Sequence, residues 1–155
     1  MKLTHVILYY PSMEKGGIEV NIRHLVKYLT NKGIKVTLIS NKIDTKRLGI
    51  NKRNFKLIKT DTQFTNSILP YRFLTSLFSI KKLIKTIKNN KKENTVVFSM
   101  QSSMVSILVS KFYKTKIVAR NSEDPISSTI YADNYISSII VFFLRFIIYN
   151  FADGI

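Results

Sequence analysis

Two adjacent glycines, Gly16 and Gly17, stand between a short apolar run and a segment with helical periodicity. The apolar run covers residues 5–10, and Glu19 falls in the first turn expected of the helix. Backbone N–H groups point outward at a helix N-terminus, and the helix dipole favours an anion there. Because glycine has no Cβ, a phosphate or a sugar can approach its backbone closely. The pair therefore predicts an anion-binding turn, although a tight turn into a helix would use the same residues.

The spacing of these glycines excludes two common phosphate-binding motifs. It matches neither the dinucleotide pattern Gly-x-Gly-x-x-Gly nor the pattern Gly-x-x-x-x-Gly-Lys-Ser/Thr of P-loop proteins. Glu19 would also complement the helix dipole without any ligand. The two histidines are expected to be a core residue of the first strand (His5) and an exposed helix residue (His24). With two histidines and no cysteine, no metal site is expected.

Hydrophobic periodicity predicts strands that alternate with helices along the chain. Strands are expected at residues 5–10, 35–40, 55–60, 95–100 and 116–119, and helices at residues 18–32, 71–89, 102–113 and 134–151. This alternation predicts an α/β fold with a doubly wound, Rossmann-like parallel sheet covered by helices on both faces. The length of 155 residues suits one domain over residues 1–155.

The composition bounds the compartment and the partners. The chain has no cysteine and so cannot contain a disulfide. The apolar run at residues 5–10 is shorter than the apolar region of a signal peptide, and no small-residue cleavage site follows it, which favours a cytoplasmic location. The net charge of +16 would attract nucleic acid, anionic lipid or phosphorylated substrates. A coding bias toward AT-rich codons, in a chain rich in Lys, Asn and Ile, would also produce such a charge.

Two of the expected helices could contact a membrane. The helix at residues 71–89 carries an apolar stripe and a basic stripe, and the basic stripe continues just past its end. Such a helix can lie on an anionic membrane surface, although a core-packed helix with lysines facing water has the same pattern. The residues of the basic stripe are Lys81, Lys85, Lys88 and Lys92.

The second such segment, residues 136–151, is nearly apolar all round and contains Arg145. It is shorter than the ~20 residues that a transmembrane helix needs. It is therefore expected to be a buried helix, an interface helix or a monotopic membrane contact.

Four segments resemble, in order, a family 4 glycosyltransferase of the GT-B architecture. The first is the strand at 5–10 followed by the glycine pair with Glu19 and by Leu25, Leu29, Gly33 and Val36 at the family's spacing. The second, residues 96–102, is similar to the family's Val-Val-His-Ser strand end. The third, residues 117–125, is similar to a loop of members that modify cell-surface polysaccharides. The fourth, residues 151–155, contains an Ala-Asp pair similar to the one that opens the next strand in the family.

The resemblance implies the N-terminal, acceptor-side domain of such an enzyme. It places Gly16 and Gly17 near the diphosphate of a nucleotide-sugar donor, which is a substrate, with no cofactor and no required metal. The ends of the later strands, with Gln101, Arg120 and Asn121, would line the cleft between two domains. Glu19 and Glu123 are further cleft or acceptor candidates. Many members act on lipid-linked or membrane-surface acceptors.

The sequence departs from the family in two ways. Where many members have a histidine after the strand at 116–119, this chain has Arg120, Asn121 and Ser122. Arg120 is expected either to bind an acceptor phosphate or to pair with Glu123 or with the adjacent aspartate. The family also needs a second Rossmann-like domain, and this sequence ends at Ile155 before one begins. A truncated product, a fragment or one half of a split enzyme, with its donor-binding domain on another chain, is therefore expected.

The leading hypothesis is transfer of a sugar from a nucleotide-sugar to a hydroxyl of a cell-envelope glycan or a polyprenyl-linked acceptor, as in polysaccharide biosynthesis. The chain alone would be inactive. A basic nucleic-acid-binding module is the first alternative, supported by the charge but by no binding motif. The second is a membrane-peripheral protein without catalysis, on the inner face of the plasma membrane.

Overall fold

The central element is a five-stranded sheet in which every strand pair is parallel. The computed structural model describes residues 3–11, 17–41, 52–60, 71–90, 94–100, 103–120 and 135–154. The strands are β1 (His5–Tyr9), β2 (Lys35–Ser40), β3 (Phe55–Lys59), β4 (Thr95–Ser99) and β5 (Lys116–Ala119). Their order in the sheet is β3-β2-β1-β4-β5. The predicted parallel α/β fold is confirmed.

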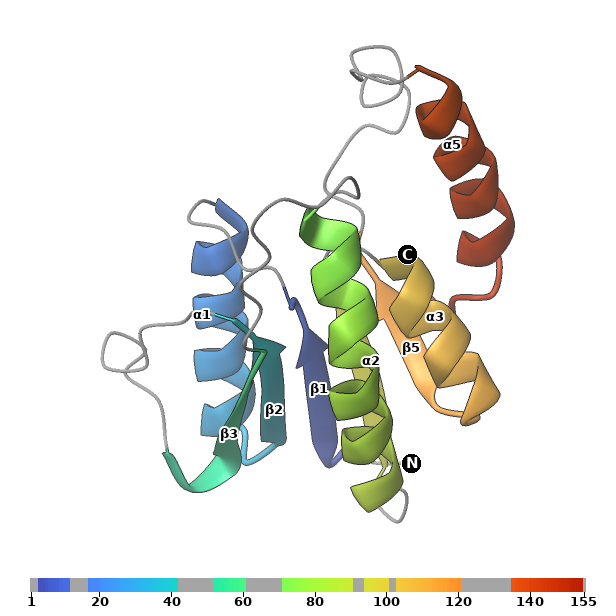
Figure 1. The fold of residues 1–155 in the computed structure, drawn as a ribbon. Helices are drawn as coiled ribbons and strands as arrows, with labels where there is room; N and C mark the ends of the chain where they lie inside the picture. The colour runs from blue at the N-terminus through green and yellow to red at the C-terminus, as the bar shows by residue number, and fades with distance from the viewer. Residues whose placement is uncertain are drawn as a thin grey trace.

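In the described ranges, four helices and a short 3₁₀ turn accompany these strands. The helices are α1 (Gly17–Asn31), α2 (Tyr71–Asn89), α3 (Ser103–Phe112) and α5 (Tyr135–Tyr149), and the turn is η2 (Lys52–Asn54). In Figure 1, α2, α3 and α5 lie side by side in that order, with α1 at the opposite side of the molecule. The predicted bounds hold to within two residues at each end.

The core has two layers because alternate residues of each strand point to opposite faces of the sheet. One layer packs α1 against Val6, Leu8 and the matching positions of β2. The other packs α2 and α3 against Ile7 and Tyr9 and the matching positions of β4 and β5. Strands buried on both faces read as continuous apolar runs, which is the pattern that the sequence shows.

His5 joins the three central strands at their amino ends. Its side chain is buried, and its Nε2 lies 2.9 Å from the Thr37 hydroxyl of β2. Its Nδ1 lies 3.3 Å from the Thr95 hydroxyl of β4. A buried polar ring needs such partners. His5 is therefore a core residue, as predicted, and lies at the end of the sheet away from the strands' carboxyl ends.

Gly33 terminates α1, and its replacement gives a first prediction. Its φ is +76°, the Ile34 N–H donates to the Leu29 carbonyl at 3.0 Å, and the Gly33 N–H donates to the Thr30 carbonyl at 3.1 Å. These bonds form a Schellman motif, which favours glycine. We expect Gly33→Ala to lower the free energy of unfolding by about 1 kcal/mol, measured by urea denaturation. Gly17→Ala, at the other end of the same helix and without positive φ, is the control and should have no such cost.

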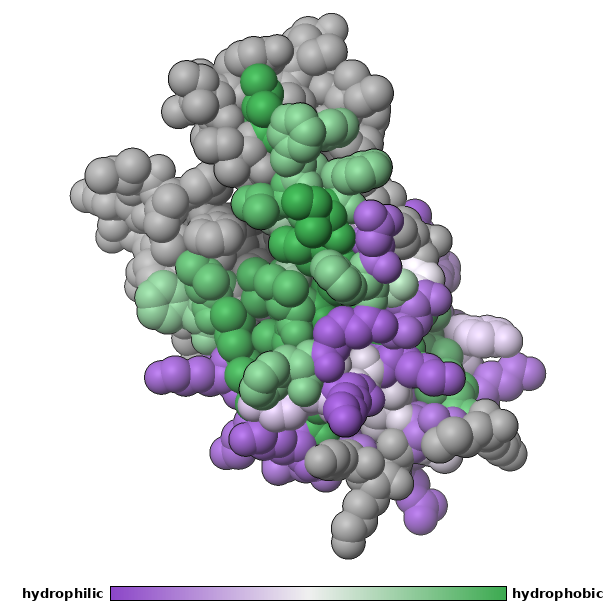
Figure 2. All heavy atoms as spheres, turned by 90° about the vertical axis from the view of Figure 1, so that its right-hand side faces the viewer, coloured by the Kyte–Doolittle hydropathy of each residue, from purple (hydrophilic) through white to green (hydrophobic). Residues whose placement is uncertain are grey.

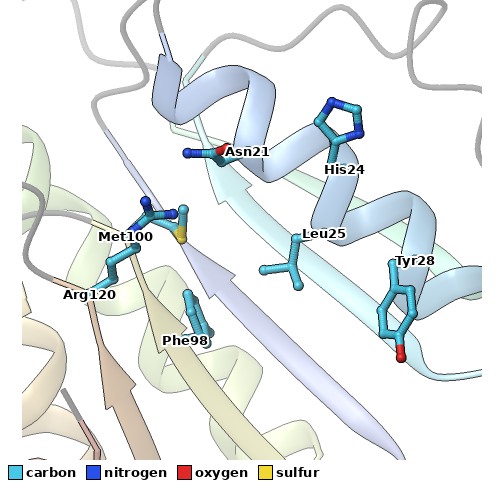
Figure 3. A pocket seen from close by; sticks show the side chains of 7 residues that line it. All are labelled: Asn21, His24, Leu25, Tyr28, Phe98, Met100 and Arg120. Atoms are coloured by element: carbon cyan, nitrogen blue, oxygen red, sulfur yellow. The ribbon is translucent and has the colours of Figure 1, made fainter.

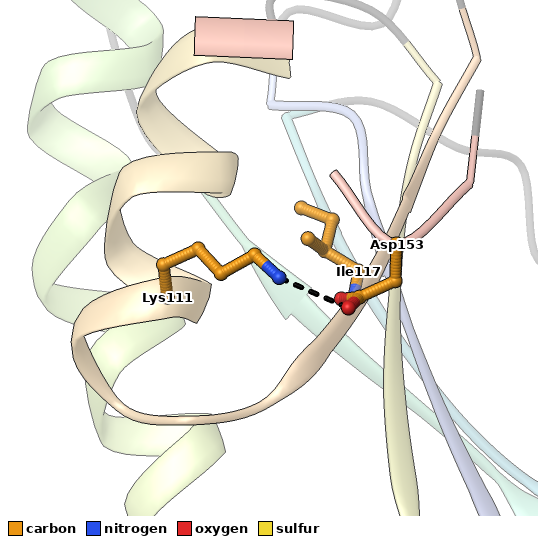
Figure 4. A network of polar contacts seen from close by, with 3 residues as sticks. All are labelled: Lys111, Ile117 and Asp153. Atoms are coloured by element: carbon orange, nitrogen blue, oxygen red, sulfur yellow. Dashed lines mark hydrogen bonds and ion pairs between the residues drawn. The ribbon is translucent and has the colours of Figure 1, made fainter. Parts of the chain in front are cut away.

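A short segment after α5 pairs with the outer edge of β5. Gly154 forms a parallel bridge with Val118, and the Asp153 N–H donates to the Ile117 carbonyl at 2.9 Å. The Asp153 carboxylate accepts hydrogen bonds from the Ile117 N–H at 2.8 Å and from the Lys111 ammonium at 2.9 Å (Figure 4). The segment that resembled the opening of a next strand therefore does pair as one at Gly154.

These contacts make stability depend on pH. The Ile117 N–H, and then Lys111, hold the pKa of the Asp153 carboxyl below its usual value of 3.8. A lowered pKa adds stability above the unfolded-state pKa, and this stability is lost as pH falls through the folded-state pKa. We expect Asp153→Asn to lower the free energy of unfolding by at most about 0.5 kcal/mol near neutral pH, because solvent screens this partly exposed carboxylate, and by less at a pH below the folded-state pKa, measured by urea denaturation. An equal loss at both pH values would show that the carboxylate charge is not involved.

Candidate functional site

A pocket lies on the α1 side of the sheet, next to the carboxyl ends of β4 and β5. Its volume is about 380 Å³, and Figure 3 shows the side chains that line it. The strand order reverses at β1, because α1 leads from β1 to β2 on one side while β4 lies on the other. In open parallel sheets, ligands bind at the carboxyl ends of the strands at such a switch point. The lining residues are Asn21, His24, Leu25, Tyr28, Phe98, Met100 and Arg120.

Helix α1 supplies one wall. Its four lining residues, Asn21, His24, Leu25 and Tyr28, recur at i, i+3, i+4 and i+7 and so form one stripe. Leu25 is half-buried against the core, whereas the other three are exposed. Figure 3 shows the Asn21 amide directed toward Met100 and Arg120. The wall thus offers an amide, an imidazole and a phenol beside an apolar contact, which are hydrogen-bonding groups suited to a polar ligand.

Strands β4 and β5 supply the floor and the charge. Phe98 and Met100 point to the α1 face and make the floor apolar. Arg120 directly follows β5, where its backbone N–H donates to the Ser99 carbonyl at 2.8 Å. Its side chain is exposed, and no described residue forms a hydrogen bond or ion pair with the guanidinium. A fixed backbone with an available guanidinium at the pocket rim is suited to binding phosphate or carboxylate oxygens.

Gly17 is the first residue of α1 and is exposed. Apart from its chain neighbours and the backbone of its own helix, no described heavy atom lies within 4 Å of the position that a Cβ would take there. Among the described residues, nothing therefore fills the space beside the backbone at this helix start. The role of Gly17 at a donor diphosphate stays a prediction. Gly16 lies outside the described residues.

Glu19 does not line the pocket. It forms an ion pair with Arg23, one turn later on α1. At 100° per residue, Glu19 and Arg23 lie on the side of the helix opposite Asn21 and Leu25. Its role at the cleft stays a prediction, and the contact that the structure shows is the helical pair. Of the remaining cleft candidates, Gln101, Asn121 and Glu123 lie outside the described residues.

The predicted basic stripe belongs to another surface. Lys81, Lys85 and Lys88 are exposed on α2, which packs on the face of the sheet opposite α1. They therefore cannot line the pocket. Lys92 lies outside the described residues. None of the helices in the described ranges is long and apolar enough to cross a membrane.

Sequence reasoning missed most of the pocket. His24 was expected to be exposed, which is confirmed, but it was given no role, and Asn21, Tyr28 and Phe98 were not singled out. The stripe at residues 21, 24, 25 and 28 lies beside the buried stripe of the same helix. Once the strand order was known, this position could have identified it as the α1 wall of the pocket. In the described ranges, no group of three or more His, Asp or Glu side chains is placed to hold a metal ion.

Solved structures of other proteins have a fold similar to that of this chain. No family model and no curated protein matches the sequence. A glycosyltransferase from Rickettsia africae has 22% identity and a TM-score of 0.54, over 84% of this chain and 34% of that chain. Phytolacca americana UGT2, solved with UDP-2-fluoro-glucose and pterostilbene, has 10% identity and a TM-score of 0.60, over 81% of this chain and 32% of that chain. Acinetobacter baumannii MurG has 13% identity and a TM-score of 0.50, over 75% of this chain and 34% of that chain.

The fold is glycosyltransferase-like. At these identities the similarity concerns the fold alone, and it is shared with GT-B glycosyltransferases from different sources. The chain spans about a third of the length of each of these three structures. The glycosyltransferase-like domain described here therefore corresponds to one part of proteins of that size.

Proposed function

We propose that this chain is the acceptor-side, N-terminal domain of a family 4 glycosyltransferase. The reaction is transfer of a sugar from a nucleotide-sugar to a hydroxyl of a cell-envelope glycan or a lipid-linked acceptor. The observation that supports it best is the pocket, which lies at the switch point of a glycosyltransferase-like sheet with the Arg120 guanidinium at its rim. The ordered segments of family resemblance in the sequence support the same assignment.

Each residue in or near the pocket would have a role in binding or catalysis that follows from its chemistry. The exposed backbone at Gly17 and the N-terminus of α1 would stabilise the charge that develops on the leaving diphosphate. Arg120 would bind a phosphate of the acceptor or of the donor. Asn21 would hydrogen-bond to sugar hydroxyls, while Phe98 and Met100 would pack against the apolar face of the sugar ring. Catalysis would come from positioning and electrostatic stabilisation.

A second domain would complete the site by delivering the nucleotide-sugar. In this proposal the donor-binding domain follows in the same protein or lies on a partner chain, and the cleft forms between it and the α1 side of this domain. The nucleotide-sugar is a substrate, and the proposal requires no further cofactor. The chain by itself would not transfer sugar.

The test starts from the coding DNA beyond the Ile155 codon and in the neighbouring gene. The chain, joined to or mixed with the encoded donor-binding domain, is incubated with labelled nucleotide-sugars and polyprenyl-phosphate-linked acceptors. We expect incorporation of label into the acceptor and release of nucleoside diphosphate, neither of which occurs with the chain alone. The absence of any second Rossmann-like domain from this DNA, or of transfer from every donor tried, would contradict the proposal.

A further inference from the structure

An apolar surface spans the outward sides of α3 and α5. Figure 2 shows it as a continuous green area, bordered below by hydrophilic side chains. Soluble monomers rarely expose contiguous apolar patches larger than a few hundred Å², and larger ones usually mark an interaction site. Its members include Phe112, which is 79% exposed, Phe146, which is 69% exposed, and also Leu108, Phe143, Leu144, Ile147 and Phe151.

The exposure follows from the composition of α5, which is apolar on two sides. Ile148 and Tyr149 pack toward the core layer that contains α2 and α3. Phe143 and Phe146, together with Leu144 and Ile147, take the other side and have no described neighbour covering them. The helix has 15 residues, or about 22 Å of length, and one of its sides is already packed. It can therefore present an apolar side along a surface rather than across a bilayer.

A basic border adjoins this surface. The Lys88 ammonium of α2 lies 5.4 Å from the centroid of the Tyr113 ring, and that ring stacks edge-on against Phe112 at 5.1 Å. Lys81 and Lys85 continue the exposed stripe along α2. The two acidic residues in the described ranges, Glu19 and Asp153, are each in an ion pair with a basic side chain. Within the described ranges, no acidic side chain therefore neutralises the lysines of the border.

The charge argues against a second copy as the occupant. Two copies would bring chains of net charge +16, with their lysine borders, into one interface. The positive charges of the two copies would repel one another across such an interface. An anionic lipid surface instead satisfies both features, because acyl chains accept the aromatic side chains and headgroup phosphates accept the lysines.

We propose that the α3–α5 surface docks on an anionic lipid bilayer. The outward side of α5 enters the boundary between headgroups and acyl chains, with Phe112 beside it. The lysines of α2 contact the headgroups at the border, where each is expected to contribute about 1 kcal/mol, or roughly fivefold in affinity. This docking does not depend on sugar transfer, so it can be tested without any donor or acceptor.

The experiment is cosedimentation of the full chain with vesicles of phosphatidylcholine, alone or mixed with phosphatidylglycerol. We expect binding to the mixed vesicles and much weaker binding to the neutral ones. The double change Phe143→Ser with Phe146→Ser should lower binding at least about tenfold, because both exposed rings leave the boundary. Val20→Ser, an exposed apolar residue on α1, is the control and should bind as the unchanged chain does. Circular dichroism checks that each variant is folded, and Phe146→Ser alone replaces the double change if that one fails to fold.

A charge-matched pair separates an oriented contact from general attraction. One double variant removes two exposed positive charges from the border, by Lys85→Gln with Lys88→Gln. The other removes two exposed positive charges from the α1 side, by Lys27→Gln with Lys32→Gln. We expect the first to lower binding to anionic vesicles at least about tenfold and the second by less than about twofold. Equal losses from the two pairs would overturn the proposal. So would absent vesicle binding, or a vesicle-independent dimer that the phenylalanine changes dissociate, since a second copy would then cover this surface.

Discussion

Arg120→Ala, in a protein that joins this chain to its donor-binding domain, should lower kcat/KM for sugar transfer by about 10²- to 10³-fold. The guanidinium stands at the rim of the pocket and no described residue engages it, so its charge is available to a substrate phosphate. Its backbone is held by the bond to the Ser99 carbonyl, so the change should leave the sheet intact. Initial rates give the loss, and thermal denaturation should show nearly the same Tm.

Two further variants identify what Arg120 contributes. Arg120→Lys keeps the charge but loses the forked geometry, so we expect an intermediate loss of activity. Lys56→Ala removes the same charge from an exposed position on the edge strand β3, and it should leave kcat/KM unchanged within about twofold. If Arg120→Ala and Lys56→Ala had equal effects, Arg120 would have no specific role in the pocket.

Gly17→Val, in the same joined protein, should lower kcat at least about 100-fold while the domain stays folded. Apart from neighbouring backbone, a Cβ at Gly17 meets no described atom within 4 Å, so the described part of the fold leaves room for a side chain there. A ligand held by the backbone at the start of α1 would, however, collide with the valine methyl groups. Rates with saturating donor and acceptor measure the loss, and urea denaturation measures stability.

The outcome of this substitution separates the two roles of the glycine pair. Unchanged turnover would mean that Gly17 only forms a turn into α1. Loss of activity together with a large loss of stability would equally contradict the account, because the effect would then come from the fold. Gly17→Ala adds one carbon in place of three and should give a smaller loss of activity than valine.

The strands and helices could be predicted because their signals are local. The apolar stripe of α1 and the β-branched run of β4 each fix an element within a few residues of sequence. The strand order has no such signal, since it depends on which of several buried strands pair. The pocket depends on that order, because it brings residues 21–28 of α1 next to residues 98–120 of β4 and β5. Its α1 wall was therefore not predicted.

The candidate site residues show the same difference between what local sequence predicts and what packing decides. Arg120 was named as a cleft residue from the family resemblance, supported by the rule that ligands bind at the carboxyl ends of parallel strands, and it lies at the pocket. Glu19 was named from the resemblance, and its side chain forms an ion pair with Arg23 away from the pocket. The position of a helical residue relative to the buried stripe gives the direction of its side chain, which the resemblance does not.

Helix α5 shows where the sequence left alternatives that only packing decides. An all-round apolar segment favours burial, an interface or a membrane contact without distinguishing them. The structure places one side of α5 against the core layer and leaves Phe143 and Phe146 exposed, so the described residues bury the helix on one side. Since the neighbours of a helix set which of its sides is covered, this could not be read from α5 alone.

Amide hydrogen exchange shows whether the substrates bind at the pocket when the free joined protein is compared with the protein bound to the donor and acceptor that support transfer. We expect slowed exchange in peptides spanning residues 17–28 and 98–120, which form the pocket. Peptides spanning residues 55–59 of the edge strand β3 should exchange at the same rate in both samples. Slowed exchange in this domain that spares both pocket peptides would show that substrates bind elsewhere and would contradict the account.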